Sequence, residues 1–163
     1  MTEFDAELRG LRLVHTGLVC RDIDVAKRRL SQFMGVEWVG VEREDWSLTV
    51  FGKEVSIPLR IAHASTGQAH FELIEAVPDT PWVTGEDIVQ HHLCFHSASS
   101  TLVCQQFEAQ GYTRVLGRSG DPQGYFQDPN GLLIEIIGDD LLAYLNNFYQ
   151  QSSAAAAARE SAL

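Results

Sequence analysis

Residues 11–35, LRLVHTGLVCRDIDVAKRRLSQFMG, carry the pattern on which the predicted fold depends. Residues 11–20 are mostly apolar or β-branched, which is typical of a buried strand. Asp22 is suited to cap a helix whose apolar residues recur at steps of three and four, and Gly35 is suited to end it. We therefore predict a strand followed by one amphipathic helix.

Three further strands are predicted after this helix. Strand-like pieces span residues 36–41 and 46–51, and two more strands span residues 57–64 and 69–77. The polar segment Ser65–Gln68 between the last two is a hairpin signal. The first half of the chain is thus predicted to run strand, helix and three strands.

The same order of elements returns in the second half. A strand is predicted over residues 91–96, and the helix after it, capped by Ser99 or Ser100, is expected to end at Gly111. The remaining strands are predicted at residues 112–116, 124–127 and 132–137, the last two separated by the turn Asp128–Gly131. This is an internal repeat of architecture with little residue identity between its copies.

The predicted organisation has five parts. They are an N-terminal extension (1–10), a first βαβββ module (11–78), a linker (79–89), a second βαβββ module (90–138), and a C-terminal helix with an Ala-rich tail (139–163). The helix has an apolar stripe over residues 139–150. Residues 154–163 have no apolar face to bury, so they are expected to fray.

The composition excludes several classes of protein. Of the 163 residues, 45% are hydrophobic and 21% are charged, so the chain can bury a core and is not expected to be disordered. A formal net charge of −10 repels phosphate backbones, and no apolar run is long enough for a membrane span, so we expect neither nucleic acid nor a membrane as partner. The acidic start is unlike a secretory signal, and the number of cysteines is odd, so we expect free thiols and a cytoplasmic location.

Four ionisable residues interrupt the apolar strands: His15, Glu72, His92 and Glu135. A carboxylate in such a run is costly unless it is paired or bound to a cation. A single His or Glu in a strand is more often a satisfied or solvent-facing side chain, but here a His and a Glu fall at matching places in both halves. Two imidazoles and two carboxylates suit one divalent ion such as nickel, cobalt, zinc, manganese or iron.

Four stretches carry a family resemblance: LRLVHTGLVCRDIDVAKRRL (11–30), HFELIEAVPDTPW (70–82), HHLCFH (91–96) and YFQDPNGLLIEII (125–137). Together they resemble the vicinal oxygen chelate superfamily, which includes glyoxalase I, methylmalonyl-CoA epimerase and bleomycin-resistance proteins. The resemblance implies an α+β fold in which two tandem βαβββ modules form a cupped mixed sheet around a metal site. It also implies that His15, Glu72, His92 and Glu135 are the metal ligands.

The residue types at the metal positions bear on the class of activity. Within the superfamily that the chain resembles, the metal ligands of glyoxalase I are typically His, Glu, His and Glu, as here. Methylmalonyl-CoA epimerases usually have Gln at the position of Glu72. The segments HHLCFH (91–96) and TPW (80–82) nevertheless resemble the epimerase branch more closely. No set of arginine and asparagine residues for holding glutathione is evident in the sequence.

The resemblance implies a divalent-metal-dependent isomerase, epimerase or lyase that removes a proton next to a metal-chelated carbonyl. Its substrate would be a small carbonyl compound or thioester, as for a glyoxalase or an acyl-CoA epimerase. Glu135 is the first choice for the base and Glu72 the second. The alternatives are an Fe(II)-dependent dioxygenase on the same fold and a small-molecule-binding protein without turnover. Because the superfamily is often dimeric, we expect a homodimer.

Two further candidates lie on the predicted strand 57–64. If residues 65–68 form a four-residue turn, His63 faces His70, shares the metal face and is a second acid or base. If the register slips by one residue, Arg60 points inward instead and anchors an anionic group of the substrate.

Overall fold

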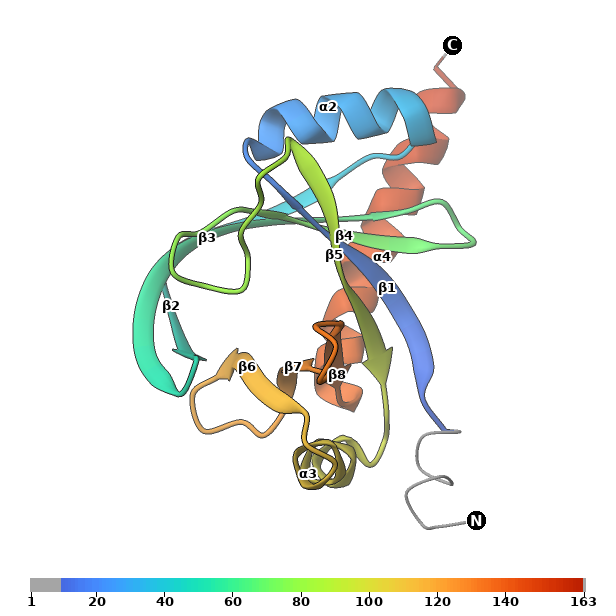
Figure 1. Ribbon diagram of the computed structural model, residues 1–163. Coiled ribbons are helices and arrows are strands. Elements are labelled where there is room, and N and C mark those ends of the chain that lie inside the picture. Colours follow the sequence, from blue (N-terminus) through green and yellow to red (C-terminus); the bar gives the residue numbers. More distant parts are fainter. Residues whose placement is uncertain (1–9, 163) are drawn as a thin grey trace.

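The structure, a computed structural model, describes residues 10–162, and its eight strands close into a barrel (Figure 1). The strands are β1 (Arg12–Cys20), β2 (Val39–Val50), β3 (Lys53–Ser65), β4 (His70–Glu75), β5 (Ile88–His96), β6 (Thr113–Arg118), β7 (Gly124–Gln127) and β8 (Leu133–Ile137). Their order around the barrel is β1-β4-β3-β2-β6-β7-β8-β5, and β5 pairs again with β1. The expected N-terminal extension, residues 1–10, lies outside the described residues except for Gly10.

The two halves of the barrel repeat one arrangement. β1 is parallel to β4 in the first half, and β5 is parallel to β8 in the second, whereas the other pairs within each half are antiparallel. The halves meet through the antiparallel pairs β1–β5 and β2–β6. The predicted α+β architecture of two tandem βαβββ units is therefore confirmed. The module boundaries stay a prediction, and β5 begins at Ile88, within the segment expected to be the linker.

Helix α2 (Ile23–Met34) covers the outer face of the first half (Figure 1). It begins where Asp22 Oδ1 accepts hydrogen bonds from the backbone amides of Asp24 and Val25, and it ends at Gly35, whose φ of 68° lies in the left-handed region. Its Ile23 and Ala26 are buried in a cluster with residues of β3 and β4. Both ends of the helix are as the sequence predicts.

Helix α3 (Ser100–Ala109) takes the corresponding place on the second half. Its buried Val103 and Phe107 pack against Phe126 of β7 and Ile136 of β8. Each helix therefore buries the outer face of its own module, and the inner face is left to line the barrel.

Strand β2 is longer than the sequence predicts. It is one strand over Val39–Val50, whereas the pattern indicates separate pieces at 36–41 and 46–51. A bulge between Arg43 and Trp46 interrupts its pairing with β3. The bulge coincides with a charged, exposed run that breaks the alternation of apolar and polar residues by which a strand is identified.

The β3–β4 hairpin differs from the predicted register by two residues. His63 pairs with Glu72, whereas a turn at residues 65–68 would place it opposite His70. Side chains alternate with a period of two, so a shift of two leaves each of them on its predicted face. His63 accordingly lines the inside of the barrel.

Helix α4 (Asp139–Glu160) follows β8 and passes beside both halves of the barrel (Figure 1). Its buried Leu145 and Tyr149 pack against Val14 of β1 and Cys94 of β5. The helix continues through most of the Ala-rich tail, so the fraying expected for residues 154–163 is not seen as far as Glu160.

Two contacts explain why the second half of α4 is held. The buried hydroxyl of Ser152 accepts a hydrogen bond of 2.9 Å from the backbone amide of Ser65 and donates to the carbonyl of Glu37. Arg159 forms an ion pair of 2.7 Å with the Glu37 carboxylate. The tail is therefore fixed by polar contacts with the first module, and no apolar stripe is needed.

The interior of the barrel is largely apolar. Its buried members are Val19, Leu48, Val50, Leu59, Ile61, Ile74, Trp82, Val115, Leu116 and Tyr125. Among residues 10–162, no helix combines the length and the hydropathy that crossing a bilayer requires.

Candidate metal centre

Four neighbouring strands place the four predicted ligands at one point inside the barrel. His15 lies on β1, Glu72 on β4, His92 on β5 and Glu135 on β8. Around the barrel these strands follow one another as β4, β1, β5 and β8. All four residues are at most 8% exposed. The sequence repeat thus becomes one buried cluster to which each module contributes one His and one Glu.

The distances within the cluster fit a single cation. The Nε2 atoms of His15 and His92 are 3.2 Å apart. Glu72 Oε2 lies 3.6 and 3.3 Å from these nitrogens, and Glu135 Oε2 lies 3.3 and 3.5 Å from them. Metal–ligand bonds of about 2.0–2.2 Å separate neighbouring ligand atoms by roughly 3.0–3.6 Å, so one ion fits among these four atoms.

A buried, unsatisfied oxygen points to the same conclusion. Glu135 Oε2 makes no well-formed hydrogen bond to any described residue. Buried polar atoms without such a partner are rare, and a bound ion is one of the few ways to satisfy them. The donor set and its geometry therefore fit one metal site, whose ion the residues alone do not identify.

Gly17 makes room for the cluster. It lies on β1 directly across from both Glu72 on β4 and His92 on β5. A Cβ atom at this position would collide with the imidazole ring of His92. Gly17 is recognisable in the sequence as well, since a glycine inside an apolar strand is itself a sign of close approach.

His92 is held from behind by its neighbour in the sequence. Its Nδ1 lies 3.0 Å from Nδ1 of His91, and Nε2 of His91 lies 2.7 Å from the carbonyl oxygen of Pro81. The ring of Tyr125 packs edge-on against His92, with 4.7 Å between the ring centroids. These contacts leave Nε2 as the atom of His92 that faces the cluster.

His15 is held by the C-terminal helix. Its Nδ1 lies 2.9 Å from the hydroxyl of Tyr149 on α4, and the Tyr149 ring stacks on His70 with 4.1 Å between centroids. Burial raises the pKa of Tyr149, so this hydroxyl stays protonated at neutral pH. Neither His91 nor Tyr149 was expected in this role. Tyr149 lies 134 residues from His15 with no local motif to mark it, whereas His91 directly precedes His92 and could have been considered.

The pKa values of the cluster show that its charges stabilise one another. Burial alone would raise the pKa of Glu135, but the close imidazoles of His15 and His92 hold it at about 2. Burial also opposes ionisation of Glu72, yet the same two imidazoles lower its pKa well below the ordinary value. For His92 burial is outweighed by both glutamates, which raise its pKa. The carboxylates are therefore ionised at neutral pH, and a bound cation would take the place of the protons that the imidazoles otherwise hold beside them.

His63 lies beside the cluster, on the face where the sequence places it. Its Nδ1 is 4.0 Å from Glu72 Oε1 and has no hydrogen-bond partner among the described residues. Its ring packs on Phe148 of α4, with 4.9 Å between centroids. Burial lowers the pKa of His63, so the imidazole is neutral at pH 7. Its role as a second acid or base stays a prediction.

A cavity of about 200 Å³ reaches the cluster, and Glu72, Glu135 and His63 are among the residues that line it. Its apolar and aromatic walls come from both modules and include Trp46, Leu48, Leu59, Ile61, Trp82, Leu116 and Tyr125. The first turns of α4 contribute Leu141, Tyr144 and Leu145. Charged residues of the lining other than the two glutamates are Arg118, Asp121 and Asp140.

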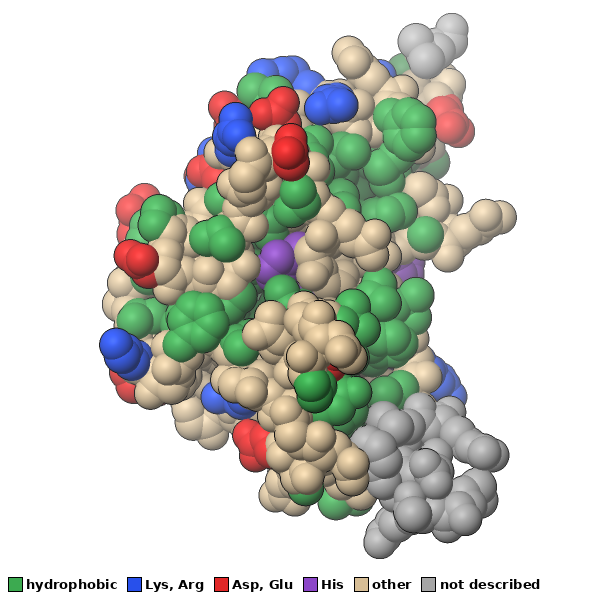
Figure 2. Space-filling model, viewed as in Figure 1, with side chains coloured by type: hydrophobic (Ala, Val, Ile, Leu, Met, Phe, Trp, Pro, Cys, Tyr) green, Lys and Arg blue, Asp and Glu red, His purple; other side chains and the backbone are tan. Residues whose placement is uncertain are grey.

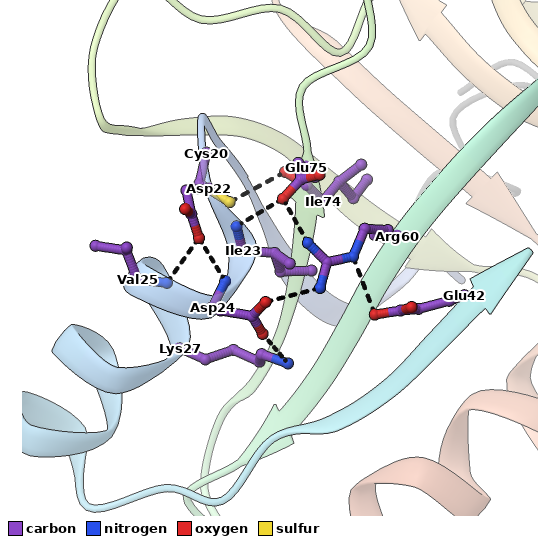
Figure 3. Close-up of polar contacts among 10 residues, drawn as sticks. All are labelled: Cys20, Asp22, Ile23, Asp24, Val25, Lys27, Glu42, Arg60, Ile74 and Glu75. Atoms are coloured by element: carbon purple, nitrogen blue, oxygen red, sulfur yellow. Dashed lines mark hydrogen bonds and ion pairs between the residues drawn. The ribbon is translucent and has the colours of Figure 1, made fainter.

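Arg60 lies on the other face of β3 (Figure 3). Its guanidinium forms ion pairs of 2.8 Å with Asp24, 2.9 Å with Glu42 and 2.9 Å with Glu75. The register shift of two residues, rather than one, keeps Arg60 on this face, so the condition for its predicted inward position is not met. The structure does not bring Arg60 to the ligands, and its contacts join α2 to β2, β3 and β4.

The face shown in Figure 2 carries charges of both signs. Lys and Arg side chains are interspersed with Asp and Glu, and the described residues form no broad stripe of one sign on this face. Histidine is visible over small areas only, as expected when three of the six histidines, His15, His63 and His92, are buried.

Solved structures with the same fold are similar to this chain at low sequence identity. Methylmalonyl-CoA epimerase from Mycobacterium tuberculosis matches at 18% identity and a TM-score of 0.55, covering 80% of this chain and 91% of its own. A methylmalonyl-CoA epimerase in complex with methylmalonyl-CoA and NH4+ matches at 15% identity and a TM-score of 0.55, covering 80% and 96%. A Streptomyces coelicolor epimerase variant in complex with 2-nitronate-propionyl-CoA matches at 16% identity and a TM-score of 0.54, covering 78% and 94%. At these identities the likeness shows the fold alone.

The family is shown by a comparison of sequence. No curated protein matches the chain. The model of the glyoxalase/bleomycin resistance protein/dioxygenase superfamily matches residues 14–127, which is more than half of this chain. This range contains His15, Glu72 and His92, and the structure adds Glu135 from β8. The chain therefore belongs to the glyoxalase/bleomycin resistance protein/dioxygenase superfamily.

Proposed function

We propose that the protein is a divalent-metal-dependent isomerase, epimerase or lyase that moves a proton next to a carbonyl group of its substrate. The observation that supports this proposal is the convergence of His15, Glu72, His92 and Glu135 beside a cavity with largely apolar walls. Apolar walls lower the local dielectric constant, which strengthens electrostatic interactions near the ligands.

The four ligands would hold the ion through the Nε2 and Oε2 atoms that face one another. A bound divalent ion supplies Lewis acidity, which acidifies a C–H group next to a chelated carbonyl. Two imidazole nitrogens and two carboxylate oxygens suit nickel, cobalt, zinc, manganese or iron. The second carboxylate distinguishes this set from the two-His, one-carboxylate set of Fe(II) oxygenases.

Glu135 is the base that we favour. Its Oε2 makes no well-formed hydrogen bond, whereas Glu72 Oε2 accepts one of 3.4 Å from the Tyr125 hydroxyl. The less constrained carboxylate reorients toward a substrate C–H at lower cost. His63 lines the cavity beside Glu72 and, as a neutral imidazole, would first take up a proton and then return it, since its Nδ1 is free of other partners among the described residues.

The substrate that we propose is a small carbonyl compound or an acyl thioester. The apolar walls suit an acyl group, and methylmalonyl-CoA epimerases are among the structures that share the fold. Return of the proton to the opposite face of the same carbon gives epimerisation. Return to the neighbouring carbon gives isomerisation, which with a hemithioacetal is the reaction of a glyoxalase-type lyase.

Solvent deuterium exchange tests the proposal. Purified protein loaded in turn with each candidate metal is incubated in D2O with acyl thioesters and 2-oxo compounds that carry an acidic C–H, and exchange is followed by NMR. We expect metal-dependent exchange at that carbon, abolished by a chelator. If none of these substrates exchanges with any of the metals, and the protein consumes oxygen in the presence of Fe(II), the dioxygenase alternative is supported instead.

A homodimer is the assembly that we propose, because the superfamily is often dimeric. Light scattering of the purified protein measures its mass in solution. A mass of one chain at micromolar concentration would contradict this part of the proposal.

A further inference from the structure

A chain of hydrogen bonds behind His92 has a direction fixed by chemistry. The carbonyl oxygen of Pro81 can only accept, so Nε2 of His91, at 2.7 Å, carries the proton between them. In a neutral imidazole the other nitrogen of His91 then accepts. Its partner at 3.0 Å, Nδ1 of His92, therefore donates, and when His92 is neutral its Nε2 keeps the lone pair on the side of the cluster.

The end of this chain is itself held in place. The backbone amide of Val77 donates to the carbonyl of Trp82 at 2.8 Å, and the Thr80 hydroxyl donates to the carbonyl of Val77 at 2.8 Å. Trp82 is buried and packs edge-on against Tyr125, which packs in turn against His92. The loop that presents the Pro81 carbonyl is thus packed, through Trp82 and Tyr125, against the His92 ring.

We propose that His91 is a positioning residue that fixes His92 in the tautomer whose Nε2 binds the metal ion. The inference rests on the metal centre of the proposed function, but it does not require turnover of any substrate. His91 contributes no ligand atom to the cluster. It accepts a hydrogen bond from Nδ1 of His92 and is itself held by the Pro81 carbonyl.

Zinc affinity tests this role. His91→Phe keeps a ring of similar size but removes both hydrogen bonds, and we expect zinc to bind about 10–100-fold more weakly in competition with a chromogenic chelator. His91→Asn restores an acceptor close to the position of Nδ1 and should recover much of the loss. The matched control is His96→Phe, because His96 pairs with Asp139 at 2.7 Å and does not line the cavity. This variant should bind zinc as wild type does.

The protonated ring nitrogens give a second readout that does not depend on any variant folding. In zinc-loaded wild type, ¹H–¹⁵N spectra of the imidazoles should show a proton on Nδ1 of His92 and on Nε2 of His91. A proton on Nδ1 of His91, or zinc affinity unchanged in His91→Phe, overturns the inference and leaves the proposed function standing. A wild-type protein that binds no divalent ion overturns both.

Discussion

Glu135 is the residue whose replacement best separates catalysis from metal binding. Glu135→Gln keeps the size of the side chain and one oxygen ligand, but the amide cannot take up a proton. We expect turnover to fall by about 10²- to 10⁴-fold, because positioned proton transfer contributes on that order. The measurement is the rate of deuterium exchange under metal saturation. Glu108→Gln, on the exposed part of α3, is the control, and equal rates in the two variants would refute Glu135 as the base.

Gly17 offers a test of the space that the cluster needs. Gly17→Ala places a methyl group against the His92 ring, whereas Gly40→Ala on β2 brings its Cβ to 3.7 Å from a carbonyl oxygen, an ordinary contact. We expect Gly17→Ala to weaken zinc binding at least about tenfold, as displaced ligands do, and Gly40→Ala to leave it unchanged. Calorimetric titration measures both. Unchanged zinc affinity in Gly17→Ala would show that the His92 ring does not need this space.

Single residues differ in how far the sequence predicts them. The four ligands are predictable because a charge inside an apolar strand is costly, and because the repeat places a His and a Glu in each half. His91 and Tyr149 are not, since their roles depend on the contact of His91 with the Pro81 carbonyl and on that of Tyr149 with His15, neither of which a sequence pattern marks. Arg60 depends on a register that a hairpin sequence specifies only to within a residue or two.

At the scale of elements, α4 is fastened to the first module by Ser152. Ser152→Ala leaves the amide of Ser65 and the carbonyl of Glu37 without their partner in a buried place. We expect the free energy of unfolding to fall by about 1–3 kcal/mol, which is the usual cost of an unsatisfied buried group. Ser153→Ala on the exposed side of the same helix is the control. Equal denaturation midpoints for the two variants would contradict this account of the helix.

The ion pairs of Arg60 predict a pH dependence of stability. A hydrogen bond from Arg60, with Lys27 adding to it, lowers the pKa of Asp24 from 3.8 to about 2. Because the pKa of Asp24 is lower in the folded protein, its carboxylate stabilises the fold fully at a pH above its ordinary pKa. This contribution is lost as the pH falls through about 2. Arg60→Gln should therefore be less stable than wild type at pH 7, with a gap that narrows between about pH 4 and 2. A raised KM with unchanged stability would instead support the anchoring of substrate by Arg60.

Most elements are predictable from local patterns, and the exceptions have identifiable causes. Helix α2 begins after Asp22 and ends at Gly35, as predicted. The charged run in β2 hides the continuity of that strand, because a bulge lets several polar residues follow one another. The Ala-rich end of α4 has no periodic apolar face, so its anchoring through Ser152 and Arg159 could not be predicted from periodicity.

At the scale of the whole molecule, the repeat explains both the fold and the site. Each module contributes a parallel pair, β1 with β4 or β5 with β8, that carries one His and one Glu. The antiparallel pairing of β1 with β5 brings the two pairs together. The order of elements is predictable from the sequence. Closure of the barrel by pairing of β2 with β6 is not, because no sequence pattern marks these two strands, one from each half, as partners.

The central claim is that side chains from both halves of the chain hold one divalent ion, and zinc-binding stoichiometry tests it most directly. Metal-free protein is titrated with zinc, and the bound metal is counted by mass spectrometry for wild type and for His15→Ala and Glu135→Ala, one variant from each half. We predict one ion per chain in wild type and strongly weakened binding in both variants. Absence of tight binding in wild type, or binding that either variant leaves intact, would contradict the account.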